Sequence, residues 1–196
     1  MSKRSTSVAL FLVGATAFAL AGCREETVDA QAFPDLQSCL DATGSGSLFS
    51  ADDCRQGFEE AQALNAETAP RYDSLEVCEA QYGEGNCGSE QQVTGGSGMG
   101  SIFMPLLAGY LMGNMLGGGR GLGAQPLHRT ADGRFATPAG TTYANNTGKG
   151  KVGAGAFTKA PTTVGKPPLT KATAAQRGGF GSSATRSTSG VRSMGG

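Results

Sequence analysis

The sequence has few of the residues that build a large hydrophobic core. Its 196 residues include no tryptophan, only 38% belong to hydrophobic types, and 32 are glycine. So little apolar material over this length argues against one large, well-packed enzyme domain. Histidine is equally scarce, because His128 is the single one, in a Pro-Leu-His-Arg stretch. We expect its side chain to be solvated and assign it no function, since no serine or cysteine nucleophile accompanies it.

The patterns of metal, nucleotide and acid–base sites are also missing. No Cys-x-x-Cys pair occurs, so the sequence predicts no metal centre. The glycine-rich stretch 117–123 lacks the Gly-Lys-Ser or Gly-Lys-Thr of a phosphate-binding loop. The carboxylates are spread along predicted helix faces with no aromatic platform for a sugar, which is typical of solvated surface. We therefore expect no catalytic residues and no cofactor.

Charge is divided between two halves of the chain. Sixteen basic and sixteen acidic residues give zero net charge, but fifteen acids precede Gly95 and eleven bases follow it. The two halves can therefore attract each other, and a basic segment can also bind anionic polymers.

The first twenty-two residues have the features of a secretory signal. Two basic residues precede an apolar run, Val8 to Leu20, which is short for a mature membrane span. The sequence Leu20-Ala-Gly-Cys23 resembles the lipobox of bacterial lipoproteins, whose cysteine is acylated and becomes the first mature residue. We predict a signal peptide over 1–22 and lipid attachment at Cys23; a plain signal peptide with an incidental cysteine is the alternative.

The residue after the lipidated cysteine bears on localisation. Arg24 stands where an aspartate would signal retention in the inner membrane, by analogy with the sorting pattern of bacterial lipoproteins. We expect a protein of the cell envelope, anchored in the outer membrane by lipid and facing the periplasm. Several buried acyl chains make such attachment effectively permanent without a membrane-spanning helix.

Four cysteines remain after Cys23, an even number for an oxidising compartment, and they predict two disulfides. Spacing alone leaves three pairings open. Two stretches with a leucine three residues before a cysteine favour local pairing within each repeat. The predicted bridges are Cys39 with Cys54 and Cys78 with Cys87. Each would constrain the unfolded chain by roughly 3 kcal/mol, which matters for about 70 residues with little core.

Two helices are expected within this acidic, cysteine-rich domain, residues 23–94. Ser50 and Asp53 resemble a capping box, and the apolar period that follows predicts a helix from about Ala51 to Ala66. Asp73 and Glu76 indicate a second capped start, for a shorter helix that ends at Gly83.

Residues 101–117, within the segment 95–123, form the long uncharged apolar stretch of the mature chain. Gly109, Gly113 and Gly117 recur every four residues, which on a helix gives one stripe for close helix pairing. A helix of this length reaches roughly 25 Å, short of the 30 Å hydrocarbon layer. Three arrangements stay open: packing on the acidic domain or on a second copy, insertion at a membrane, and a collapsed glycine-rich loop.

The last part, residues 124–196, is rich in glycine, serine, threonine and basic residues and has no helical or strand period. This composition predicts a largely disordered basic tail. The stretch Arg177-Gly-Gly-Phe-Gly181 is similar to RNA-binding arginine-glycine segments, but export of the chain argues against a nucleic-acid partner.

Several blocks, in order and spacing, resemble the YgiB-type family of uncharacterised bacterial lipoproteins. The resemblance implies an envelope location and brings no catalytic residues, because the function of that family is unknown. The blocks are Glu67-Thr-Ala-Pro-Arg-Tyr72, Glu79-Ala-Gln-Tyr-Gly-Glu-Gly-Asn-Cys87, Met104-Pro-Leu-Leu-Ala-Gly-Tyr-Leu-Met-Gly113, Arg177-Gly-Gly-Phe-Gly181 and Arg192-Ser-Met-Gly-Gly196.

These observations predict a mostly α fold: a small disulfide-stapled helical domain, a glycine-rich apolar helix and a largely disordered basic tail. The expected function is that of a non-enzymatic envelope lipoprotein, a tethered interaction module whose basic tail binds an envelope protein or an anionic envelope polymer. One alternative is a membrane-inserting or pore-associated oligomer built on the glycine-spaced helix. Another is an accessory that presents the tail to a neighbouring enzyme.

Overall fold

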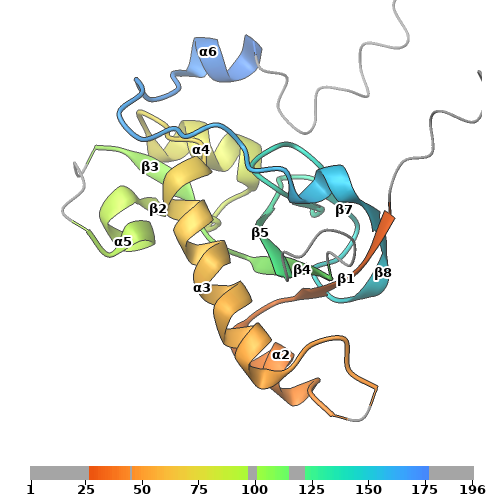
Figure 1. Ribbon diagram of the computed structural model, residues 1–196. Coiled ribbons are helices and arrows are strands. Elements are labelled where there is room, and N and C mark those ends of the chain that lie inside the picture. The colour runs from red at the N-terminus through yellow and green to blue at the C-terminus, as the bar shows by residue number, and fades with distance from the viewer. Residues whose placement is uncertain (1–26, 45, 97–100, 115–121, 177–196) are drawn as a thin grey trace, which may run out of the picture.

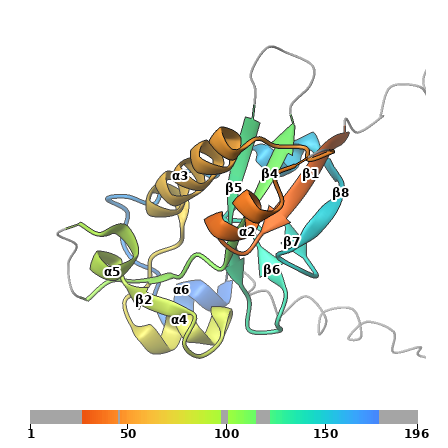
Figure 2. The ribbon, with the colours of Figure 1, turned by 90° about the horizontal axis from the view of Figure 1, so that it is seen from below.

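The computed structural model describes residues 27–44, 46–96, 101–114 and 122–176. At its centre lies an antiparallel sheet with the strand order β7-β6-β5-β4-β1-β8. Figures 1 and 2 show the long helix α3 lying across one face of this sheet. The strands are β1 (Thr27–Phe33), β4 (Gly109–Asn114), β5 (Leu122–Arg129), β6 (Phe135–Ala136), β7 (Thr142–Tyr143) and β8 (Gly148–Gly153).

The helices and a second, two-stranded sheet pack around this centre. Strand β2 (Cys87–Ser89) pairs with β3 (Phe103–Pro105). The helices are α2 (Leu36–Asp41), α3 (Ala51–Thr68), α4 (Leu75–Tyr82), α5 (Glu90–Thr94) and α6 (Lys171–Gln176), with a 3₁₀ turn η1 (Ala154–Phe157).

The helix predicted from Ala51 is confirmed, and so is its capping box. The Ser50 side chain accepts a hydrogen bond from the Asp53 backbone N–H, and the Asp53 carboxylate accepts one from the Ser50 N–H at 2.8 Å. These reciprocal bonds satisfy amide groups that the first helical turn leaves without partners. The helix continues to Thr68, two residues beyond the predicted end.

The second predicted helix is also present, as α4, but its cap is one residue further on. Ser74, not Asp73, accepts the hydrogen bond from the Val77 N–H. Gly83 ends the helix with φ 87°, a left-handed value that glycine adopts without steric cost.

The prediction of a mostly α fold is wrong. The structure is an α+β fold organised on the antiparallel sheet, and β1, from the domain predicted to be helical, lies between β4 and β8. The residues 27–94 therefore do not form a separate helical unit. Their first strand is shared with the C-terminal half of the chain.

The apolar helix predicted over residues 101–117 is also wrong. Its described part contains strands β3 and β4 instead. Tyr110 and Met112 of β4 pack into the core beneath α3, while Leu111 packs into a second core on the opposite face. Because both faces are buried, the strand has no polar alternation and reads as a continuous apolar run.

The described glycines of the predicted helix-pairing stripe lie in strand β4 and allow close packing against it. The ring of Phe157 lies over Gly113 of β4 and Gly123 of β5, and a Cβ atom at Gly113 would overlap this ring. At Gly109, a Cβ atom would lie 2.8 Å from the Phe33 carbonyl oxygen. Gly117 lies outside the described residues. The described glycines therefore permit close packing within one chain.

The largely disordered tail predicted from residue 124 is a further error for the part that the structure describes. Residues 124–176 supply most of β5, all of β6, β7 and β8, the turn η1 and helix α6. The strand β8, with the sequence Gly-Lys-Gly-Lys-Val-Gly, pairs with β1 at the edge of the sheet. Its low hydrophobicity follows from this edge position, where lysines also discourage pairing with other chains.

Substituting Gly113 tests the packing of Phe157 on the sheet. We expect Gly113→Val to lower the free energy of unfolding by about 2 kcal/mol, because the added side chain displaces the ring. Urea denaturation measures the loss. Gly150→Val on β8 is the matched control, because no atom of the described chain lies within 4 Å of a Cβ atom built there.

In a Phe157→Ala background, the same Gly113→Val change should cost much less, since the ring is gone. An equal cost in both backgrounds would show that the glycine is needed for another reason.

Candidate functional site

The predicted disulfides are confirmed. Cys39 is joined to Cys54 with a Cα–Cα distance of 5.7 Å, and Cys78 to Cys87 with 6.2 Å. The predicted lipid-attachment residue, Cys23, lies outside the described residues.

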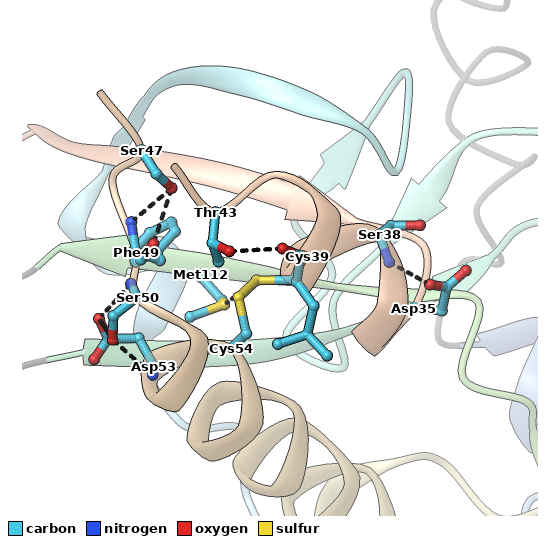
Figure 3. The surroundings of a disulfide bond; sticks show 11 residues. Asp35, Ser38, Cys39, Thr43, Ser47, Phe49, Ser50, Asp53, Cys54 and Met112 are labelled. Atoms are coloured by element: carbon cyan, nitrogen blue, oxygen red, sulfur yellow. Dashed lines mark hydrogen bonds between the residues drawn. A yellow bond between two sulfur atoms is a disulfide. The ribbon is translucent and has the colours of Figure 1, made fainter. Parts of the chain in front are cut away.

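The Cys39–Cys54 bridge fastens α2 to the start of α3, beneath which the core is packed (Figure 3). Both cysteines are fully buried, and the Cys39 Sγ atom lies 3.8 Å from the Met112 Sδ atom of β4. Gly57 of α3 allows the helix to approach the same methionine, since a Cβ atom there would lie 2.8 Å from its Cε atom. This bridge belongs to the core and has a structural role.

The Cys78–Cys87 bridge joins α4 to β2 in a separate cluster of buried side chains. Tyr72, Tyr82 and Ala174 of α6 share this cluster. The rings of Tyr72 and Tyr82 meet edge to face, with centroids 6.1 Å apart. The bridge therefore fixes the base of α4 beside the cavity described next.

A cavity of about 490 Å³ lies between the end of α3, helix α4, the turn 138–140 and the segment 158–170. We call it the Arg71 cavity. The segment 158–170 connects η1 with α6 and is drawn in blue in Figure 1. The volume falls in the range of small-molecule sites. Its polar walls come from Thr68, Arg71, Gln81, Thr163 and Lys166, and its prolines are Pro70, Pro138, Pro161 and Pro167.

Arg71 is the buried charge of this cavity. Its side chain is 5% exposed, and its Nε atom donates to a Glu90 carboxylate oxygen at 2.7 Å. The Nη2 atom donates to the Ala66 carbonyl oxygen at 2.8 Å, and the Nη1 atom donates to the Thr163 hydroxyl. A buried guanidinium requires such partners, because desolvation without them is costly. The network holds the guanidinium in one position.

The segment 158–170 is attached to the rest of the fold along the cavity. The Thr163 N–H donates to the Glu67 carbonyl oxygen at 2.9 Å, and the Leu169 N–H donates to the Arg71 carbonyl oxygen at 2.7 Å. The Asp73 N–H in turn donates to the Leu169 carbonyl oxygen at 3.1 Å. The cavity wall is therefore fixed by backbone hydrogen bonds.

A second hollow of about 680 Å³ lies between α3, α5 and the residues 106–107. Among the described residues in its wall, Glu59 is the charged one, and it is exposed. Because this hollow has no buried charge, the Arg71 cavity is the stronger candidate site.

The expectation that His128 is solvated is wrong. The imidazole is 1% exposed, its Nε2 atom lies 2.6 Å from the Asn65 Oδ1 atom, and its ring meets Tyr82 edge to face. With the Nε2–H donating to the amide oxygen, Nδ1 is a buried acceptor with no hydrogen-bond partner among the described residues. Burial lowers the pKa of His128 to about 3, so the side chain is neutral at physiological pH.

The expected attraction between the two halves of the chain takes the form of ion pairs. Lys151 pairs with Asp29 at 3.2 Å, Lys159 with Glu67 at 2.6 Å and Lys171 with Glu76 at 4.0 Å. All six side chains are at least 41% exposed, so each pair contributes little to stability. Nevertheless, these ion pairs involve three lysines of the segment that was predicted to bind polyanions.

Sequence reasoning missed Arg71 and Lys166 as residues of the candidate site. It also missed the buried pair of Asn65 and His128, which does not line the cavity. Arg71 lies in one of the blocks that carry the family resemblance, which was the available signal. Its partner Thr163 is 92 positions away, and Asn65 and His128 are 63 apart. No local pattern relates residues at such separations.

Two further findings concern the described residues. No three His, Cys, Asp or Glu side chains among them are grouped as a metal site would require. Their helices also include none with the length and apolar character that crossing a membrane demands.

The fold and the cavity define a disulfide-containing α+β protein with a site of small-molecule size. The model of a family described as "protein of unknown function (DUF1190)" matches residues 27–190, and the chain belongs to this family. The resemblance to YgiB-type proteins is consistent with that membership. No solved structure matches the chain.

The buried imidazole predicts a specific dependence of stability on pH. The folded state depresses the pKa of His128 from 6.5 to about 3, so its neutral form is favoured by folding. Stability is therefore complete above about pH 6.5 and falls as the pH drops toward 3, because the unfolded chain takes up the proton. Between pH 7 and pH 5 the histidine should account for a loss of about 2 kcal/mol.

Urea denaturation at several pH values measures this loss, with His128→Gln as the comparison. The variant removes the titrating group and should lose less stability than the parent chain between pH 7 and pH 5. Parallel pH profiles for the two chains would contradict the assignment.

Proposed function

We propose that this chain is a non-enzymatic lipoprotein of the cell envelope, held at a membrane through lipid on Cys23 and acting as a tethered binding module. The two disulfides are the main support for an envelope location, because such bonds persist in oxidising compartments and are rare in the cytoplasm. The lipobox-like sequence before Cys23 supports the anchor. Arg24 supports delivery to the outer membrane, with the folded part facing the periplasm.

The Arg71 cavity supports a binding role for the folded part of the chain. Clefts of this volume with a few fixed polar groups are typical of ligand sites. A polyanion-binding tail is less favoured, since three lysines of residues 124–176 pair with acidic residues of the same chain. We therefore place recognition in the fold. The glycine-spaced helix of the pore alternative does not form, so that alternative is withdrawn.

Substitutions around the lipobox test the anchor and its address. In fractionated envelopes, Cys23→Ser should leave the membrane fraction, because no acyl chain can be attached. Arg24→Asp is the matched variant, which should remain membrane-bound and move from the outer to the inner membrane. A Cys23→Ser protein that still partitions into detergent would refute the lipid anchor.

Thiol labelling of cells quenched with acid and then denatured tests the compartment. Without reductant, an alkylating reagent applied under denaturing conditions should leave Cys39, Cys54, Cys78 and Cys87 unmodified, and after reduction all four should react. The measurement is the mass shift of the purified protein. Four reactive thiols before reduction would place the chain in a reducing compartment and contradict the proposal.

A further inference from the structure

The Arg71 cavity has walls from parts of the chain that are far apart in sequence. Thr68 to Tyr72 follow α3, Gln81 and Tyr82 belong to α4, and Pro138 to Gly140 form the turn after β6. The segment 158–170 closes the remaining side and is tied to Arg71 through both its backbone and Thr163. Such a cavity is formed by the fold itself and does not depend on a single mobile loop.

The charges in the cavity wall are of one sign. Arg71 and Lys166 are basic, and among the residues that the structure describes no acidic one lines the cavity. Glu90 neutralises one of these charges through its ion pair with the Arg71 guanidinium. Lys166 is exposed and makes no ion pair within the described residues. The site therefore carries a net charge of about one positive unit, which matches a singly charged anion.

The polar groups at the cavity are chiefly hydrogen-bond donors. A guanidinium has five N–H groups, and three hydrogen bonds of Arg71 are made within the described part of the fold. The Gln81 Oε1 atom accepts the Tyr72 hydroxyl at 2.8 Å, so the amide nitrogen is the group that it can offer to a ligand. Lys166 adds an ammonium group. Such a set recognises a group that only accepts hydrogen bonds.

We propose that the Arg71 cavity binds a carboxylate on a short, otherwise uncharged body, either a small organic acid or the carboxyl end of a peptide. An ionised carboxylate accepts hydrogen bonds and carries one negative charge. The prolines and the buried tyrosines give the aliphatic part of the ligand an apolar wall. The proposal rests on the binding role proposed above and names its ligand class.

Calorimetric titration of the full-length mature protein in a neutral detergent tests this site. The probes are acetyl-alanyl-alanine, its C-terminal amide and pentanoate. The free peptide acid should bind at least about tenfold more tightly than the amide, which lacks the charge. Binding of pentanoate as well would indicate a small acid as the ligand, and binding of the peptide acid without pentanoate would indicate a peptide end. Both outcomes support a carboxylate site.

Two variants locate the binding. Lys166→Gln should weaken binding of the peptide acid about fivefold, because it removes an exposed cation whose attraction to the carboxylate contributes roughly 1 kcal/mol. Ala139→Phe should abolish binding by filling the mouth of the cavity, where Ala139 is exposed. The matched control is Lys149→Gln on β8, an exposed lysine outside the cavity, which should leave the affinity within twofold. Urea denaturation of each variant confirms that it is folded.

Equal affinity for the acid and the amide would overturn the proposal, as would equal effects of Lys166→Gln and Lys149→Gln. No binding of either acid up to about 10 mM would overturn it as well, because even millimolar affinity would register. The titration measures ligand binding at the cavity, and this binding does not depend on the lipid. A failed titration with Cys23-dependent membrane attachment would therefore refute the ligand class alone.

Discussion

The structure depends on the burial of both faces of β4. Beneath α3, Met112 meets the Cys39–Cys54 bridge and the bare backbone of Gly57. On the other face, Phe157 packs on the bare backbone of Gly113 and Gly123. The glycines let a helix on one side and an aromatic ring on the other approach the sheet closely. This packing joins the acidic half of the chain to the basic half in one fold and replaces a conventional large core.

The joining of the two halves also forms the candidate site. Arg71 belongs to the acidic half, and its guanidinium contacts Thr163 of the basic half. The cavity exists because the segment 158–170 returns across the ends of α3 and α4 and is fixed there by backbone hydrogen bonds. Three exposed ion pairs also join lysines of the basic half to carboxylates of the acidic half. The positive charge that remains at Lys166 lies at the cavity, which is why recognition of an anion is assigned to that place.

Signals for helix caps and local disulfides were largely reliable, whereas the apolar run and the glycine spacing were misleading, and no long-range signal was present. The capping box of Ser50 and Asp53 involves residues three positions apart, so it could be recognised directly. The error at residues 101–117 has a physical origin, because a strand buried on both faces has the same uninterrupted apolar sequence as a buried helix. The glycines at four-residue spacing then strengthened the wrong choice. For β8, the opposite holds: an edge strand made of glycine and lysine looks like a linker.

By itself, the sequence determined the long helix α3 with its capping box, the presence of α4 and the disulfide pairing, since each of these depends on residues close together in the chain. Cys39 and Cys54 are 15 positions apart, and Cys78 and Cys87 only 9. The tertiary structure alone decided the sheet, the buried state of His128 and the cavity around Arg71. His128 and Asn65 are 63 positions apart, Arg71 and Thr163 are 92 apart, and in the sheet Thr27 pairs with Gly153. Composition and periodicity do not indicate which distant segments will meet.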